Sequence, residues 1–380
     1  MPAVEVEVEC PVHDSFRVQQ VAGLFDVPLA ERSVEWFEVE LPGDDEEWSV
    51  GLIVGPSGSG KSTVARERFG NCLYEAGDWP TDRAVIDCFG ELSVKRVVEL
   101  FTAVGFGSPP SWVKPYHVLS NGERFRCDLA RSLAVGIEAE DAGRAEPAVT
   151  PVVAFDEFTS VVDRNVARVC SAAIAKGVRK GRIPCRFVAV TCHYDVAEWL
   201  EADWVLDMST GRLTRRRLRR PDVRLEVHRC GVAAWRLFAR HHYLTGTIAT
   251  AARCYLATWD GMPVSFAATL PVIAKPRHRR FTRIVTLPDY QGIGIGMRTV
   301  AAVAELHREE GLRINVTSSH PALINHCRAS PLWRAVNVNK TGQGSRRHRT
   351  AFRLYRSSAG RAVVSFEYVG REARGSRLEG

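Results

Sequence analysis

The chain has 380 residues, of which 45% are hydrophobic and 25% charged, so it can bury full hydrophobic cores. This composition excludes a disordered protein and favours two domains or three. The N-terminal residues alternate valine with glutamate and lack the basic end and apolar stretch of a signal peptide. No apolar run approaches the roughly 20 residues that span a bilayer. We therefore expect a cytoplasmic protein without membrane insertion.

Charge and cysteine are distributed in informative ways. Residues 1–220 hold 26 Lys+Arg and 34 Asp+Glu, a net −8, whereas residues 221–380 hold 25 and 10, a net +15. A basic second half is expected of a domain that meets phosphates, although an arginine-rich genome would give the same count. The 10 cysteines include no CxxC pair, which argues against a zinc cluster and favours reduced thiols.

A phosphate-binding loop is indicated by GPSGSGKST, Gly55–Thr63, which follows the apolar stretch Val50–Val54 and precedes a helix-compatible segment. Its glycines let backbone N–H groups close around phosphate oxygens, Lys61 would reach the β and γ phosphates, and Ser62 would ligate magnesium. The loop residues predicted to bind ATP are Gly55, Ser57, Gly58, Gly60, Lys61, Ser62 and Thr63.

Two carboxylates end a second strand-like run, PVVAFDE, at residues 151–157. Asp156 would hold magnesium and Glu157 would polarise the attacking water, because phosphoryl transfer depends on positioning and charge neutralisation. Nucleotide-bound magnesium is the metal that the sequence implies.

Three further motifs follow the order of a known family. LSNGE (Leu119–Glu123) precedes the carboxylates, SVVD (Ser160–Asp163) follows them, and the strand-like VAVTCH ends at His193. Together with the phosphate loop, these motifs resemble those of the ATP-binding-cassette (ABC) ATPase family. LSNGE resembles the family's signature motif, usually written LSGGQ, SVVD resembles its D-loop, and His193 has the position of its switch histidine. The resemblance covers about residues 20–210.

The resemblance implies a head-to-tail homodimer that hydrolyses ATP. Each nucleotide would lie between Lys61 of one protomer and Ser120 and Gly122 of the other, with Asp163 also in the ATP site and His193 acting with Glu157 in hydrolysis. Phe25 or Trp36 could stack on adenine, and either could equally be a core aromatic.

Two features depart from the family pattern. No glutamine lies between the phosphate loop and the signature, so Asp87, which ends the strand-like RAVID, is the positional substitute for the Q-loop residue. The helical segment at residues 89–118 is short for a subunit that docks on membrane domains. This favours a soluble cassette ATPase over a transporter subunit, which stays a further alternative.

The two halves meet at a basic stretch, RLTRRRLRRPD, at residues 212–222, which we interpret as a linker. Its arginines could instead line a nucleic-acid path. The sequence thus predicts an α/β P-loop NTPase domain over residues 1–211 and an α+β domain over residues 223–380.

The second domain opens with an antiparallel pattern. Strand-like runs at Cys254–Trp259 and Met262–Leu270 are joined by a DG turn, and a third strand, Phe281–Leu287, leads into QGIGIG (Gln291–Gly296) and an amphipathic helix. Glycines at a helix start let the backbone approach a pyrophosphate. A dinucleotide-binding fold would need this loop after the first strand of a parallel sheet, which this order does not provide.

The pattern resembles the GNAT acetyltransferase family, whose coenzyme A loop reads Q/R-x-x-G-x-G/A. The resemblance implies acetyl-CoA as cofactor, with the pantetheine arm paired to the backbone of Ile284 and Val285. The loop residues assigned to acetyl-CoA are Gln291, Gly292, Ile293, Gly294, Ile295 and Gly296.

Catalytic groups for acyl transfer are less constrained by the sequence. N-acetyl transfer needs an unprotonated amine, a path for its proton and a group that protonates the leaving thiolate. The HHYL segment (His241–Leu244) lies on the first helix-like segment, where the family shapes its acceptor site, and a second set ends the strand after the coenzyme helix. Packing or capping is an equally open role for each candidate; they are His242, Tyr243, Ser318, Ser319, His320, Tyr290 and Tyr355.

The whole arrangement resembles a family of predicted cassette ATPases fused to an acetyltransferase domain, and segments Asp14–Pro28 and Ser365–Gly370 fit it. The HHY segment is also similar to Mom-type phage enzymes that modify adenine in DNA. We therefore expect an ATPase whose partner domain acylates a nucleic acid or nucleoprotein. The alternatives are a regulatory ATPase with a non-catalytic acetyl-CoA sensor, and the ATP-binding subunit of a transporter.

Overall fold

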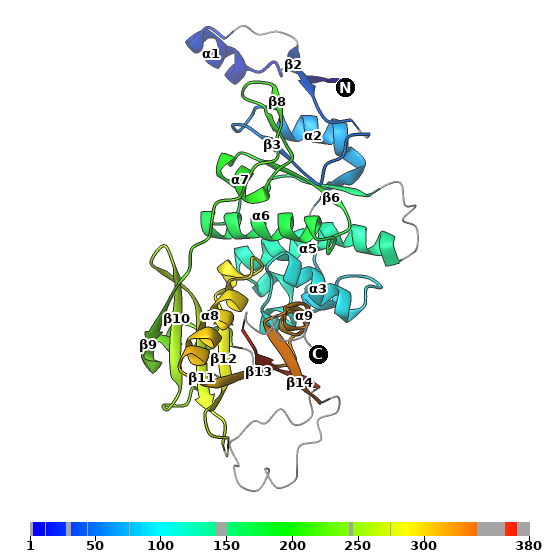
Figure 1. The fold of residues 1–380 in the computed structure, drawn as a ribbon. Helices are drawn as coiled ribbons and strands as arrows, with labels where there is room; N and C mark the ends of the chain where they lie inside the picture. The colour runs from blue at the N-terminus through cyan, green and yellow to red at the C-terminus, as the bar shows by residue number, and fades with distance from the viewer. Residues whose placement is uncertain are drawn as a thin grey trace. The chain divides into compact units, whose positions relative to one another are not determined.

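The computed structural model describes residues 3–11, 13–27, 32–43, 45–75, 77–141, 150–242, 246–273, 275–339 and 362–370 (Figure 1). The chain forms two compact units. Unit 1 comprises residues 1–78 and 128–220, and unit 2 comprises residues 79–127 and 221–380. The division falls within helix α5 (Asn121–Asp141).

Unit 1 is built on a six-stranded sheet in the order β4-β5-β6-β3-β7-β8. Five strands are parallel, and β8 pairs antiparallel with β7 at the edge. Strand β3 matches the predicted apolar stretch and is buried throughout, as expected of a central parallel strand. The strand bounds are β3 Val50–Val54, β4 Leu73–Tyr74, β5 Val152–Phe155, β6 Arg186–Thr191, β7 Trp204–Asp207 and β8 Arg212–Arg215.

Helices of unit 1 connect these strands. Helix α6 (Arg164–Arg179) follows β5, and its apolar positions are buried. The core beneath the sheet gathers large side chains such as Trp204, Ile53 and Phe69. The remaining helices are α2 (Lys61–Phe69) and α7 (Ala197–Leu200), with short 3-10 turns η1 (Gly70–Cys72) and η4 (Tyr194–Val196).

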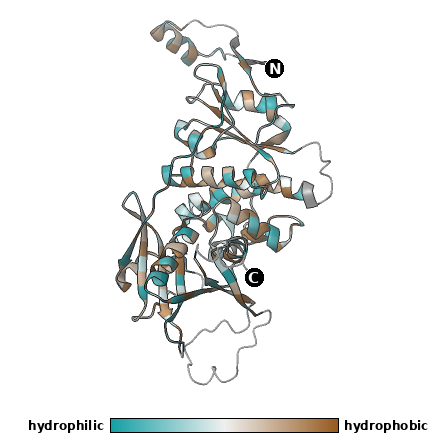
Figure 2. Ribbon diagram, in the orientation of Figure 1, coloured by the Kyte–Doolittle hydropathy of each residue, from teal (hydrophilic) through white to brown (hydrophobic). Residues whose placement is uncertain are grey.

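The N-terminal segment of unit 1 is a separate two-stranded sheet with one helix. Strands β1 (Ala3–Pro11) and β2 (Arg32–Glu40) pair antiparallel, and α1 (Phe16–Phe25) lies between them in sequence. Helix α1 exposes large apolar side chains, which Figure 2 shows as hydrophobic colour. Phe25 is 72% exposed and Trp36 67% exposed, so neither is a core aromatic. Stacking on adenine stays a prediction for both.

Unit 2 is built on a seven-stranded sheet in the order β14-β15-β13-β12-β11-β10-β9. All neighbours are antiparallel except β12 and β13, which are parallel. The predicted hairpin is confirmed, since Asp260 and Gly261 both have positive φ between β10 and β11. The strand bounds are β9 Glu226–Cys230, β10 Arg253–Trp259, β11 Met262–Pro271, β12 His278–Thr286, β13 Arg313–Ser318, β14 Trp333–Asn339 and β15 Val363–Tyr368.

Helix α8 (Ile295–Glu309) packs on β11, β12 and β13 of this sheet. Its buried residues, including Val300, Val303 and Ala304, join a core with Phe281 and Phe366. Helix α9 (Pro321–Ala329) contacts β14 and also α3 (Val94–Ala103). The remaining elements are α4 (Pro109–Trp112) and the 3-10 turns η2 (Val85–Asp87), η3 (Tyr116–Val118), η5 (Val232–Leu237), η6 (Ala239–His241) and η7 (Pro288–Tyr290).

The compact units do not coincide with the domains predicted from sequence. Segment 79–127, which carries the LSNGE motif, belongs to the same unit as the sheet of residues 221–380. Part of the predicted linker, Arg212–Arg215, is a strand of the first sheet. The predicted boundaries follow motif order along the chain, whereas the units follow contacts, and α3 contacts α9 across more than 200 residues. Among the described residues, no helix is both long and apolar enough to cross a membrane.

Candidate functional site

The phosphate-binding loop connects β3 to α2. Lys61 is 8% exposed, and its Nζ donates to the carbonyl of Pro56 across the loop at 2.6 Å. Gly58 and Gly60 have φ of 80° and 78°, values that side chains rarely adopt. A Cβ on Gly60 would also lie 2.4 Å from the Phe37 ring. This curve therefore requires glycine, and it presents a helix N-terminus to a phosphate.

The other predicted loop residues belong to the same turn. Gly55 is buried directly after β3, and Ser57 is exposed at the crest of the loop. Ser62 and Thr63 are half-buried in the first turn of α2. A hydroxyl in this first turn is the position from which a P-loop serine reaches magnesium. The residues present thus fit a magnesium nucleotide.

The two predicted carboxylates follow β5 at the same edge of the sheet. β3 and β5 are parallel, with β6 between them, so their carboxyl ends emerge together. The Glu157 N–H donates to the Asp156 carboxylate at 2.8 Å. Glu157 is exposed, and its own carboxylate accepts a 2.5 Å hydrogen bond from the Ser160 hydroxyl. This position is open to water, as a general base requires.

The turn after these carboxylates is strained. Glu157 has φ of 51° and Thr159 φ of 69°, and a β-branched residue rarely adopts such a value. Each costs on the order of 1–3 kcal/mol, so surrounding contacts must hold it. Phe158 supplies one, because its N–H donates to the Val190 carbonyl at 2.8 Å and its ring is buried. Strain of this kind clusters at functional turns.

His193 lies beside this turn, just after β6. Its Nδ1 is 3.3 Å from the buried Thr159 hydroxyl, and its N–H donates to the Thr191 hydroxyl at 3.1 Å. Burial and the nearby Arg164 lower the pKa of His193, although Asp195 acts in the opposite direction. The lowered pKa favours the neutral imidazole near pH 7. The role of His193 as the switch histidine stays a prediction.

The D-loop aspartate begins helix α6. Asp163 is the N-cap, and its carboxylate accepts hydrogen bonds from the backbone of Asn165 and Val166 at 2.9 and 3.1 Å. Arg164, the next residue, pairs with the carboxylate of Asp195. Capping thus accounts for the Asp163 side chain in this chain, and its predicted ATP contact stays a prediction.

The signature motif opens helix α5 in unit 2. Ser120 and Glu123 form a capping box: the Ser120 hydroxyl and N–H donate to the Glu123 carboxylate at 2.9 and 3.0 Å, and the Glu123 N–H approaches the hydroxyl at 3.4 Å. Burial raises the pKa of Glu123, but hydrogen bonds from Ser111 and Ser120 outweigh it and leave the pKa below the usual value. Ser120 is exposed and Gly122 partly so, so both are accessible to a nucleotide.

The predicted strand ending at Asp87 is wrong. Residues Val85–Asp87 form a 3-10 turn, and the Val85 N–H donates to the Lys114 carbonyl at 2.9 Å instead of to a neighbouring strand. Asp87 is exposed on this turn. Its role as substitute for the Q-loop glutamine stays a prediction.

The second glycine-rich loop joins β12 to α8 in unit 2. Gly292 and Gly294 have φ of 95° and 98°, and Gly294 is the N-cap of the helix. A Cβ on Gly296 would lie 2.7 Å from the Thr286 hydroxyl. Ile293 and Ile295 are buried and anchor the loop. The backbone is thus bent and bare at the start of a 15-residue helix, which fits a pyrophosphate.

Gln291, the first residue of this loop, bridges two segments of unit 2. Its Oε1 accepts from the Gly107 N–H and its Nε2 donates to the Thr286 carbonyl, both at 2.8 Å. A Cβ on Gly105, where φ is 82°, would lie 2.8 Å from the Gln291 carbonyl. Sequence reasoning missed this contact; the closely spaced glycines at 105 and 107 are the signal, since they permit close backbone approach.

Arg126 makes a second link between the same segments. The side chain is 1% exposed and lies on α5, six residues after Ser120. Its guanidinium donates to the Gly122 carbonyl of the signature and to the Pro288 carbonyl, both at 3.1 Å, and lies 3.8 Å from the Asp289 carboxylate. One buried cation thus contacts the signature motif and the turn that precedes the second glycine-rich loop.

The sheet of unit 2 opens beside this loop. Strands β12 and β13 pair at only three positions, His278–Arg280 with Arg313–Asn315, and then separate. The Val285 carbonyl accepts from the Ser265 hydroxyl of β11 at 3.1 Å, so the backbone groups of Val285 face β11. Because successive residues of a strand direct their backbone N–H and C=O groups to opposite edges, those of Ile284 face the open side. Ile284 is better placed than Val285 to pair with a pantetheine arm.

The candidates for acyl transfer have described structural roles. His320 is the N-cap of α9: its Nδ1 accepts from the Ala322 N–H at 3.3 Å, and its ring packs 6.1 Å from that of Trp112. Burial lowers the pKa of His320. Ser318 ends β13 and accepts from the His320 N–H at 2.9 Å, with Ser319 between them.

The remaining candidates are more scattered. The helix-like segment predicted around HHYL consists of the 3-10 turns η5 and η6 up to His241, and His242 is extended. His242 packs edge-on against Trp235 at 5.6 Å, and Tyr290 against Trp259 at 6.0 Å. Tyr243 and Tyr355 lie outside the described residues. Among the described residues, no group of three or more His, Cys, Asp or Glu could hold a metal ion.

Comparison with known proteins agrees with the second motif set. Residues 218–326 match the model of the Acetyltransferase (GNAT) family. This part of the chain is a GNAT acetyltransferase domain. The match takes in strands β9 to β13, the glycine-rich loop and α8.

Solved structures similar to the chain fall into two groups. The ribosomal-protein-S18-alanine N-acetyltransferase from Escherichia coli is 15% identical, over 38% of this chain and 93% of that chain, with a TM-score of 0.29. An acetyltransferase from Bacillus subtilis, solved in complex with CoA, is 14% identical over 39% and 98%, with a TM-score of 0.29. The dimeric bacterial ABC transporter cassette MJ0796 is 15% identical over 48% and 92%, with a TM-score of 0.36. No curated protein matches the chain.

Proposed function

We propose that this protein is an ABC-type ATPase whose nucleotide cycle controls an acetyl-CoA-dependent N-acetyltransferase acting on a nucleic acid or nucleoprotein. Magnesium nucleotide would bind Lys61, Ser62 and Asp156, with Glu157 as the base for the attacking water. The motif order, the glycine-dependent loop and the adjacent carboxylates support the ATPase part of the proposal. The family match and the second loop support the acetyltransferase part.

The observation that carries the coupling is the link between the signature segment and the second loop. Gln291 bonds to Gly107, and Arg126 bonds to Gly122 and Pro288. The motifs resemble those of ABC-type ATPases, in whose dimers the signature closes on the partner's nucleotide. Movement of the signature helix would thus be transmitted through Arg126 and Gln291 to the loop that holds coenzyme A.

Within the acetyltransferase, this chain would bind and orient the two reactants. Acetyl-CoA, when bound, would supply the thioester from which the acetyl group is transferred. The N–H groups of residues 292–296 and the start of α8 would hold its pyrophosphate, and the open backbone at Ile284 would align the pantetheine arm. The net +15 of residues 221–380 favours an acidic acceptor such as a nucleic acid.

A labelling experiment tests the proposal directly. The full-length protein is given labelled acetyl-CoA and Mg-ATP with separate pools of DNA, RNA and protein. We expect label in a nucleic-acid pool, and loss of that label with Lys61→Ala, because the loop without its ammonium group should not retain ATP. Label in the protein pool alone would contradict a nucleic-acid acceptor, and label unaffected by Lys61→Ala would contradict the coupling.

A regulatory ATPase with an acetyl-CoA sensor is the second candidate. It is favoured by the structural roles of the candidate imidazoles, since His320 caps a helix and His242 packs on Trp235. This function predicts that coenzyme A binds and changes ATP turnover while no pool gains label. The same labelling experiment, with a binding assay for coenzyme A beside it, separates the two functions.

A further inference from the structure

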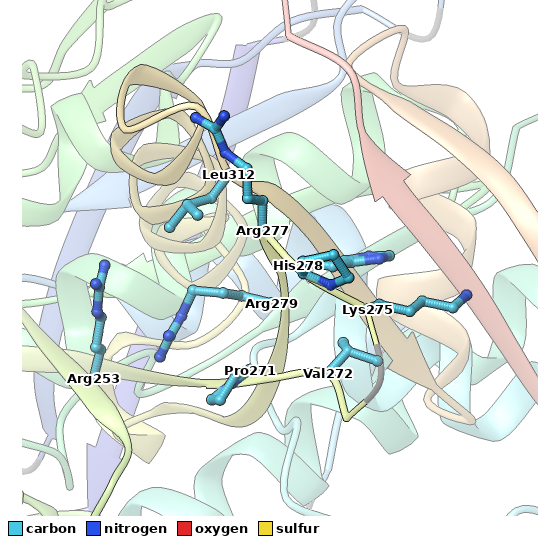
Figure 3. A pocket seen from close by; sticks show the side chains of 9 residues that line it. Arg253, Pro271, Val272, Lys275, Arg277, His278, Arg279 and Leu312 are labelled. Carbon is cyan, nitrogen blue, oxygen red and sulfur yellow. The ribbon is translucent and has the colours of Figure 1, made fainter.

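A strongly basic pocket lies at the end of β12 opposite the coenzyme loop. Its volume is about 440 Å³, and the cationic groups that line it are Arg253, Lys275, Arg277 and Arg279, with His278. None of the described residues that line it is a carboxylate. Figure 3 shows Arg253 and Arg279 on one side of the pocket and Lys275 on the other.

Arg279 is the buried element of this pocket. The residue is 8% exposed, and its Nε and Nη2 donate to the Thr269 hydroxyl and carbonyl at 3.1 and 2.9 Å. These two bonds fix the plane of the guanidinium. In the part of the chain that the structure describes, no ion pair joins Arg279 to a carboxylate, and the nearby Glu310 pairs with Arg253. A buried cation that shares its nearest carboxylate with another guanidinium is costly, and an anion in the pocket would offset this cost.

The neighbouring charges add to this imbalance. Arg253 pairs with Glu310 at 2.5 Å, and Glu310 is 45% exposed at the surface. Burial, and then the charge of Arg253, lower the pKa of Arg279. Burial, and then Arg279, lower the pKa of His307 to about 4, so this histidine, whose Nε2 lies 2.9 Å from the Thr269 hydroxyl, is neutral near pH 7. Two guanidinium groups thus share a single surface carboxylate.

We propose that this pocket binds a phosphate group, with Arg279 as its fixed fork and Arg253 and Lys275 as the charges around it. Planar guanidinium groups match the oxygens of a phosphate, and a volume of about 440 Å³ admits a phosphate with its attached sugar. The pocket is separate from the coenzyme loop, because the nine residues of β12, His278–Thr286, extend about 26 Å at the usual rise of a strand.

Two sources could supply this phosphate. A nucleic-acid strand would place one backbone phosphate in the pocket while another part of it reaches the acyl groove; this source rests on the proposed function. A free phosphorylated metabolite would bind as a single small anion. The two differ in that a strand has neighbouring phosphates and a stronger dependence of affinity on salt concentration.

The test measures binding without any acyl transfer, so its result is independent of whether the acetyltransferase reaction occurs. Fluorescein-labelled single-stranded DNA and RNA, and separately a mononucleotide and inorganic phosphate, are titrated onto the full-length protein at several salt concentrations. The variants are Arg279→Gln in the wall of the pocket and Lys275→Gln at its exposed rim. Because Lys275 is exposed, the second variant should leave the fold intact. Arg328→Gln, which removes an exposed charge on α9, is the matched control.

We expect Arg279→Gln to weaken oligonucleotide binding about tenfold, since it removes a charged hydrogen bond, and Lys275→Gln to reduce the salt dependence by about one phosphate contact. Arg328→Gln should change neither the affinity for the oligonucleotide nor its dependence on salt concentration. A loss confined to the mononucleotide and inorganic phosphate would support the pocket with a free metabolite as its ligand. Unchanged affinity for every probe in both Lys275→Gln and a correctly folded Arg279→Gln would overturn the proposal.

Discussion

Glu157 combines the two properties expected of a base that activates water: exposure and a fixed position. Its φ of 51° and its bond to Ser160 hold the carboxylate after Asp156. We predict that Glu157→Gln lowers ATP hydrolysis by about 100-fold or more, the contribution of a general base, while ATP binding persists. Phosphate release and size-exclusion chromatography with ATP measure both effects, and the variant should accumulate as an ATP-bound dimer.

The control for this prediction is Glu198→Gln, which removes an exposed carboxylate from α7 of the same unit. Hydrolysis in this variant should equal that of the wild type. Hydrolysis by Glu157→Gln at the wild-type rate would show that another group activates the water.

His307 gives a prediction for pH. It is fully buried beside Tyr255 and Thr269, and burial lowers its pKa from 6.5 to about 4. As the pH falls, the unfolded chain binds this proton before the folded chain does. The contribution of the neutral His307 to the free energy of unfolding is therefore fully present above pH 6.5 and is lost as the pH falls through 4. Lowering the pH from about 7.5 to about 5 should lower the free energy of unfolding by about 2 kcal/mol.

Urea unfolding at these two pH values measures this effect. From the higher to the lower pH, the free energy of unfolding of the sheet of unit 2 should fall by about 2 kcal/mol more in the wild type than in His307→Gln. His228→Gln, which removes an exposed imidazole on β9, should behave as the wild type. An equal loss in all three proteins would refute a neutral, buried His307.

At the scale of elements, local patterns predicted the strands and loops that carry the glycine motifs. Strand β3 begins and ends at the predicted residues, and α8 begins within the predicted loop. These features depend on hydrophobic periodicity and turn chemistry, which short sequences contain. The predicted strand at Asp87 is wrong because the segment is short and is decided by a contact from elsewhere in the chain, the bond from Val85 to Lys114.

The second glycine-rich loop gives a prediction at this scale. Gly294 has φ of 98° at the N-cap of α8, where an L side chain costs about 1–2 kcal/mol. The chain would relax this strain by moving the N–H groups of the loop. We therefore predict that Gly294→Ala weakens coenzyme A binding by about tenfold, measured by calorimetry.

A glycine without these constraints serves as the control. Gly231 has φ of −76°, and a Cβ there would meet nothing within 4 Å. Gly231→Ala should bind coenzyme A as the wild type does. If both alanine variants retained full affinity, the loop would not be the pyrophosphate site.

At the scale of the molecule, the association of segment 79–127 with the acetyltransferase sheet was not predictable from the sequence. Gly107 and Gln291 are 184 residues apart, and no local pattern pairs them. Their contact depends on packing of α3 against α9 and on the bare backbone at Gly105. The consequence is thermodynamic: if ATP closes the signature and changes coenzyme affinity, coenzyme A must change ATP affinity by the same factor.

Removal of the Gln291 side chain should weaken this coupling, because only the link through Arg126 then remains. In the Glu157→Gln background, ATP should change the affinity for coenzyme A by about fivefold or more, within the usual range of allosteric coupling. Adding Gln291→Ala should bring the ratio of affinities with and without ATP closer to 1, because the bonds to Gly107 and Thr286 are lost. The ratio isolates coupling from any direct loss of coenzyme binding. Asn325→Ala, an exposed amide on α9, should preserve the ratio, and an unchanged ratio in Gln291→Ala would place the coupling elsewhere.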